Sequence, residues 1–138
     1  MSHSLVQAPA VPRQRRVVLA GRIIAFLGVL HLVSTAVMSS GHVSGWFTGE
    51  MWFPANGPTD LAPGQGAFWL VVGSFGLPLT CLGLLVDWIG RRGSVPPSFV
   101  AWMIGGWGTL GAVILIPSPF ILTWVPAVML LLAARRAA

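Results

Sequence analysis

The feature that most constrains this chain is a series of long apolar segments separated by short polar connections. The first runs from Val17 to Met38 and contains one charged residue, Arg22. At a rise of ~1.5 Å per residue, a helix of this length crosses the ~30 Å hydrocarbon layer of a membrane. A secretory signal peptide also starts with basic residues, but its apolar core is shorter, so we interpret this segment as a retained membrane span.

Three further apolar segments complete the predicted fold, an all-α integral membrane four-helix bundle. We expect residues 17–136 to form one domain, with spans at about 17–38, 67–89, 99–116 and 120–134. Pro78 interrupts the second span and is expected to kink it, because proline lacks a backbone N–H donor. Residues 1–16 are polar, contain two prolines and show no apolar period, which is typical of a disordered tail.

The composition favours a membrane protein over a water-soluble one. With 55% apolar and only 8% charged residues, too little polar surface is available to solvate a globule of 138 residues. The net charge of +5 suggests nucleic-acid binding, but that function needs basic residues gathered on a folded surface. Here the arginines flank the apolar segments instead, so we expect no nucleic-acid partner.

The arginines also predict the topology, since positive residues in short flanks are retained on the cytoplasmic side. They precede or open the first span, separate the second from the third, and follow the fourth: Arg13, Arg15, Arg16, Arg22, Arg91, Arg92, Arg135 and Arg136. Both termini are therefore expected in the cytoplasm, and the long connection over about 40–66 is expected outside. The predicted location is the cell inner (plasma) membrane, with several crossings. Arg22 is expected to extend its side chain to the headgroups.

The connection between the first two spans is rich in glycine, proline and aromatic residues. Residues 43–53 mix aromatic and polar side chains, which predicts a short helix at the headgroup level. The stretch from His31 to Asp60 contains two of the three histidines of the chain, His31 and His42, and two of its three acidic residues, Glu50 and Asp60.

The candidate chemistry centres on His31, an ionisable residue deep in the first span. Such a group is costly in hydrocarbon and usually faces the bundle interior, so we expect polar partners from the second span, Ser74 or Thr80, within reach. The connection can fold back over the open end of the bundle and bring the Glu50 carboxylate near the His31 imidazole. An imidazole and a carboxylate placed together can transfer protons. His31 and Glu50 are therefore the candidate catalytic residues, and the candidate ligand-binding residues are Thr35, His42, Trp46, Trp52, Asp60, Trp69 and Trp107.

Each of these residues also has a structural interpretation. An intramembrane histidine more often bonds to a neighbouring helix than catalyses, and the tryptophans suit an interfacial belt. Asp87 and Arg91 are spaced for an ion pair within one helix. No motif for metal ligation, nucleotide binding or a serine nucleophile is present, so we predict no metal and no cofactor.

A string of landmarks resembles a family of short bacterial four-span proteins that carries a domain-of-unknown-function label. The landmarks are Gly21-Arg22, His31 with Thr35, Ala67-Phe68-Trp69, Asp87-Trp88, Arg91-Arg92, Pro96-Pro97, Pro117-Ser118 and Pro126. The resemblance covers about Val17 to Arg136 and departs from the family in the long external connection. It implies the fold and the membrane location, and it implies no catalytic residues.

Two hypotheses for the function remain. The first includes catalysis and the second does not, so the sequence leaves open whether the protein is an enzyme. In the first, the bundle binds a lipophilic small molecule, with acid/base isomerase or cyclase chemistry at His31. In the second, the protein is a non-catalytic membrane subunit or oligomeric scaffold that packs through its glycine-rich helix faces. Its partners would then be copies of itself or a larger membrane protein, and membrane lipid surrounds it under both hypotheses.

Overall fold

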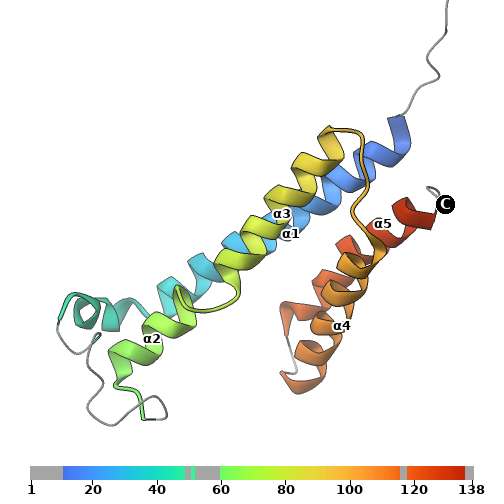
Figure 1. Ribbon diagram of the computed structural model, residues 1–138. Helices are drawn as coiled ribbons and strands as arrows, with labels where there is room; N and C mark the ends of the chain where they lie inside the picture. The colour runs from blue at the N-terminus through green and yellow to red at the C-terminus, as the bar shows by residue number, and fades with distance from the viewer. Residues whose placement is uncertain (1–10, 49–50, 52–59, 116–117, 136–138) are drawn as a thin grey trace, which may run out of the picture. The chain divides into compact units, whose positions relative to one another are not determined.

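The computed structural model describes residues 11–48, 51, 60–115 and 118–135, and no strand occurs among them. This confirms the all-α class. The α-helices are α1 (Val11–Met38), α2 (Pro63–Val71), α3 (Gly76–Arg91), α4 (Ser98–Ile114) and α5 (Trp124–Arg135), with the 3₁₀ helices η1 (Ser40–Phe47) and η3 (Pro119–Thr123) (Figure 1). The chain divides into two compact units, residues 24–83 and residues 1–23 with 84–138.

The second predicted span is divided between α2 and α3. In a continuous helix the ring of Pro78 would clash with the carbonyl group four residues earlier, which belongs to Ser74. The helix is interrupted at residues 72–75, so the predicted interruption is confirmed, but it is a break before Pro78 rather than a kink at it. At the other end, α2 starts with Pro63, and the Gln65 Oε1 accepts a hydrogen bond from the Ala62 backbone N–H at 3.0 Å.

Several other boundaries differ from the sequence-based expectation. Helix α1 begins at Val11, so residues 11–16, which we assigned to the tail, are helical, while residues 1–10 lie outside the described part. Where a helix was predicted over 43–53, the structure has the 3₁₀ helix Ser40–Phe47, and residues 49–50 and 52–59 lie outside the described part. Helices α4 and η3–α5 cover most of the third and fourth predicted spans.

In the unit 24–83, glycine lets helices approach closely. A Cβ atom on Gly28 of α1 would overlap the Thr80 side chain and lie 2.6 Å from its backbone nitrogen. A Cβ on Gly76 would lie 2.7 Å from the Leu32 side chain. Helix α1 and the start of α3 are therefore in van der Waals contact along their backbones, side by side in Figure 1.

The same holds for the α4–α5 pair in the other unit. A Cβ on Gly105 would lie 3.4 Å from the Ala127 Cβ, and one on Gly108 would overlap the Thr123 hydroxyl. The aromatic rings of Trp107 and Phe120 meet edge to face, with centroids 4.8 Å apart. The small side chains of α4 at these contacts thus let it approach η3 and α5 closely within the chain.

Helix α3 ends in a Schellman motif. The Gly93 N–H donates to the Gly90 carbonyl at 3.0 Å, and the Ser94 N–H donates to the Ile89 carbonyl at 3.2 Å. Gly93 has φ of 80°, a left-handed conformation that favours glycine. The turn therefore ends α3 at Arg91.

Many large apolar side chains of the helices are exposed, while others form a buried core together with small residues. Ala20 and Val17 of α1 are fully buried, while Phe26 of the same helix is 62% exposed. Two stretches, Gln14–Met38 and Pro63–Arg91, are long and apolar enough to cross a membrane, and α4 and η3–α5 are shorter apolar helices. In each of the two stretches, 28% of the most apolar 18-residue window is buried.

Candidate functional site

His31 lies on α1 and faces the break between α2 and α3. Its Nε2 is 2.9 Å from the Ser74 Oγ, and its ring packs on Phe75 with centroids 4.0 Å apart. The prediction that a polar atom of the second span reaches His31 is confirmed for Ser74. Thr80, the other expected partner, donates instead to the Gly76 carbonyl of its own helix at 2.8 Å.

Ser74 connects both ends of the break. Its hydroxyl donates to the Val71 carbonyl at 3.2 Å, and its Oγ accepts from the Gly76 N–H at 3.5 Å. These are backbone groups that the interruption leaves without a helical partner. While the Ser74 hydroxyl donates to the Val71 carbonyl, the His31 Nε2 must carry a proton and donate to the Ser74 Oγ. In the other tautomer Nε2 carries no proton, and Ser74 can donate to the imidazole instead, as in a nucleophile–base pair.

The polar candidates nearest His31 in sequence serve other contacts. Thr35 is buried, and its hydroxyl donates to the His31 carbonyl at 2.7 Å, so it is engaged within α1. Helix α1 ends at Met38, and His42 is exposed in η1, so His31 and His42 do not lie on one continuous helix. Asp60 is exposed, and Glu50 lies outside the described residues.

The tryptophan candidates are spread over different contacts. Trp46 of η1 packs edge to face on Phe68 of α2 with centroids 5.8 Å apart, and its buried Nε1 has no hydrogen-bond partner in the described part of the chain. Trp69 is 57% exposed. Trp107 belongs to the other unit, and Trp52 lies outside the described residues. Over the described ranges, no group of three or more His, Cys, Asp or Glu side chains is arranged to hold a metal ion.

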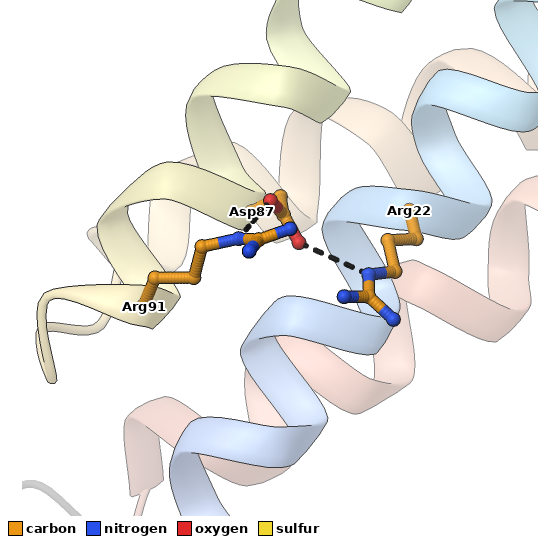
Figure 2. A network of polar contacts seen from close by, with 3 residues as sticks. All are labelled: Arg22, Asp87 and Arg91. Atoms are coloured by element: carbon orange, nitrogen blue, oxygen red, sulfur yellow. Dashed lines mark hydrogen bonds and ion pairs between the residues drawn. The ribbon is translucent and has the colours of Figure 1, made fainter.

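A charge cluster that the sequence reasoning missed joins α1 to α3. The Arg91 Nε donates to the Asp87 Oδ2 at 2.6 Å, which confirms the predicted pair within one helix. The Arg22 Nε donates to the Asp87 Oδ1 at 3.3 Å, so the Arg22 side chain is paired with α3 (Figure 2). The signal was present, because charges inside apolar segments usually pair with one another.

The two arginines remain accessible while the carboxylate does not. The Asp87 side chain is 12% exposed, against 61% for Arg22 and 60% for Arg91. A pocket of about 420 Å³ opens beside them, lined by Gln14, Arg15, Val18, Leu19, Arg22, Gly90 and Arg91. The next arginine in the chain, Arg92, stacks instead on the Trp88 ring at 4.0 Å.

These features define an all-α protein with membrane-length apolar helices and polar groups tied between them. The chain belongs to a family of unknown function (DUF6463), whose model matches residues 15–137. This confirms the resemblance to an uncharacterised family. Searches of curated proteins and of solved structures give no match.

Proposed function

We propose that the protein is a multi-pass integral protein of the inner (plasma) membrane and that it acts there as a non-catalytic membrane subunit. The observation that carries this is the large number of apolar side chains that the helices expose, while polar side chains such as Thr35 and Thr123 are buried. On α1, Phe26 and Val33 are 62% and 56% exposed, whereas Ala20 and Thr35 are buried. Such a surface is costly in water and matches hydrocarbon.

The hydroxyl groups of the apolar helices support the same surroundings. Thr35, Thr80 and Thr109 each donate to the carbonyl four residues earlier, at 2.7, 2.8 and 2.7 Å, and Thr123 donates to the Phe120 carbonyl at 2.7 Å. An unsatisfied polar group in hydrocarbon costs several kcal/mol. Bonding each hydroxyl locally removes that cost without any water.

The charge cluster supports the proposed orientation. Since Arg15 and Arg22 of α1 line the same pocket as Arg91 of α3, the arginines from these two distant segments lie at one end of the paired helices. Positive residues stay in the cytoplasm, so this end is the cytoplasmic one. Four crossings, by α1, α2–α3, α4 and η3–α5, then leave both termini inside; α4, with 17 residues, is at the lower limit for a span.

A subunit role is favoured over catalysis because the polar candidates within α1, His31 and Thr35, are engaged in hydrogen bonds that a structural role requires. His31 is bonded to Ser74 and packed on Phe75, which is what a structural histidine requires. Most glycines of the helix faces are used within the chain, but Gly106 on α4 has no atom within 4 Å of the position that a Cβ would take. With Trp102 and Leu110 exposed beside it, this is where a partner helix can approach closely.

Native mass spectrometry of the protein in nanodiscs tests this proposal. We expect a stable complex with a second copy or with another membrane protein, and we expect Gly106→Leu to dissociate it while Gly106→Ala keeps it. The matched control is Val33→Leu, which adds bulk at an exposed position of α1. A monomer without a partner in the wild type, or equal tolerance of all three variants, would contradict the subunit role.

The lipophilic-ligand hypothesis remains as a second candidate because of one observation, the 2.9 Å contact between His31 and Ser74 at the helix break. It places an imidazole and a hydroxyl together, with Glu50 as the further proton donor or acceptor expected from the sequence. Mass spectrometry of molecules that co-purify with the wild type, His31→Ala and His31→Gln separates the two roles. A ligand lost from His31→Ala while that variant stays folded supports chemistry, and lost stability that glutamine restores supports a structural histidine.

A further inference from the structure

The pocket beside Asp87 has the charge and the shape of an anion site. It is built from the N-terminal half of α1, which supplies Arg15 and Arg22, and from the last turn of α3, which supplies Gly90 and Arg91. Its volume of about 420 Å³ is within the range of ~300–1,000 Å³ typical of small-molecule sites. All of these residues belong to one compact unit.

The charges around the pocket do not cancel. Three arginines, Arg15, Arg22 and Arg91, line the pocket, and the one carboxylate beside it, Asp87, pairs with two of them, which leaves an excess of two positive charges. The C-terminus of α3 opposes this with about half a negative charge. Its carbonyl groups at Ile89 and Gly90 are already bonded by backbone N–H groups, so the positive excess prevails.

Asp87 also orients the guanidinium groups. It accepts a hydrogen bond from the Nε of both Arg22 and Arg91, whereas each guanidinium has five N–H donors in all. Figure 2 shows the terminal nitrogens of Arg22 pointing away from the carboxylate. Because both side chains are about 60% exposed, these donors are accessible to a ligand, and Asp87 serves as a positioning residue beneath them.

The geometry points to a site for a phosphate group, held by Arg15, Arg22 and Arg91. Phosphate oxygens match the planar fork of arginine donors, and several guanidiniums can share one phosphate. Val18 and Leu19 form an apolar wall of the same pocket, which suits the remainder of a phospholipid. Basic pockets between helices on the cytoplasmic side of a membrane bind anionic headgroups in this way. A free phosphate compound offers the same chemistry, so the two sources are separated by experiment.

The test uses the full chain in nanodiscs and counts retained lipids by native mass spectrometry. With phosphatidylglycerol as a minor component in phosphatidylcholine, we expect one retained phosphatidylglycerol on the wild type. Arg15→Gln, which leaves both ion pairs of Asp87 in place, should weaken this retention about tenfold, the loss of one charge-assisted contact. The control Arg92→Gln removes an equal charge from an arginine that stacks on Trp88 outside the pocket and should change retention less than about twofold.

A second variant separates a built site from diffuse attraction. Asp87→Asn raises the positive excess by one charge, so attraction to net charge alone predicts tighter binding. The proposed site predicts weaker binding, because Arg22 and Arg91 lose the group that orients them. Circular dichroism and unfolding of each variant establish that it is folded before its binding is compared.

A competition experiment distinguishes a lipid headgroup from a free phosphate compound as the ligand. Inorganic phosphate and glycerol phosphate are titrated against the protein in phosphatidylcholine nanodiscs and against retained phosphatidylglycerol. Displacement of the lipid by millimolar inorganic phosphate assigns the site to free phosphate compounds, and retention despite it assigns the site to a headgroup. Absence of binding by either probe, or an equal loss in Arg15→Gln and Arg92→Gln, would overturn the proposal. None of these outcomes depends on whether the protein has a subunit partner.

Discussion

The contact between Gly108 of α4 and Thr123 of η3 makes a sharp test of the packing described above. The perturbation is Gly108→Ala, the smallest substitution that adds a Cβ atom. That atom would overlap the Thr123 hydroxyl, lie 3.0 Å from the Thr123 Cβ and lie 3.1 Å from the Phe120 carbonyl oxygen. The hydroxyl cannot move freely, because it donates to that same carbonyl at 2.7 Å. The two chain segments must therefore separate.

The magnitude follows from comparison with Gly106→Ala on the same helix, where a Cβ would meet no atom within 4 Å. Both substitutions gain about the same helix propensity, ~1 kcal/mol, so that term cancels between them. Overpacking typically costs about 1–3 kcal/mol. We therefore expect the free energy of unfolding of Gly108→Ala to lie about 1–3 kcal/mol below that of Gly106→Ala.

The assay is reversible unfolding in detergent micelles, followed by tryptophan fluorescence, since Trp107 packs on Phe120 at this contact. A double mutant with Thr123→Ala removes the hydroxyl that the new methyl group meets and should recover part of the loss. Equal stabilities for Gly108→Ala and Gly106→Ala, or no recovery in the double mutant, would refute the close approach of α4 and η3.

Two further predictions concern α3. Arg22→Ala alone should lower the unfolding free energy by less than ~1 kcal/mol, because Arg91 still pairs with Asp87. The double variant Arg22→Ala/Arg91→Ala should lose about 1–3 kcal/mol more than the sum of the two single losses, since a mostly buried carboxylate is then left unpaired. Strictly additive losses would argue against a shared cluster. Gly93→Ala should lower the unfolding free energy by about 1–2 kcal/mol because of its φ of 80°, whereas Ser94→Ala, which keeps its backbone N–H bond, should stay within ~0.5 kcal/mol of the wild type.

The sequence predicted best the contacts that depend on spacing within one helix or on a polar residue inside an apolar segment. The Asp87–Arg91 pair follows from a spacing of four residues, which one helical turn brings together. The partner of His31 was predictable because few polar residues occur in the apolar segments, and Ser74 was one of two named. The all-α class follows from the apolar segments themselves.

What the sequence did not predict depends on how separate segments pair. Arg22 and Asp87 are 65 positions apart, and only the register of α1 against α3 brings them together. The break before Pro78 is stabilised by contacts of Ser74 with both helix ends and with His31, which no local preference specifies. The sequence also did not predict which helix packs against each glycine-rich face, since small residues allow close approach within a chain or between chains.

Cysteine accessibility in intact cells tests the central proposal, a multi-pass membrane protein with its arginine-rich ends inside. Cys81 is the sole cysteine, so Cys81→Ala supplies a cysteine-free background for Thr48→Cys in the connection proposed to be external and Ser94→Cys after α3, both exposed positions. A membrane-impermeant maleimide should label Thr48→Cys in intact spheroplasts and Ser94→Cys only after the membrane is opened. Labelling of Ser94→Cys in intact spheroplasts, or of neither position until the membrane is opened, would contradict the proposed topology.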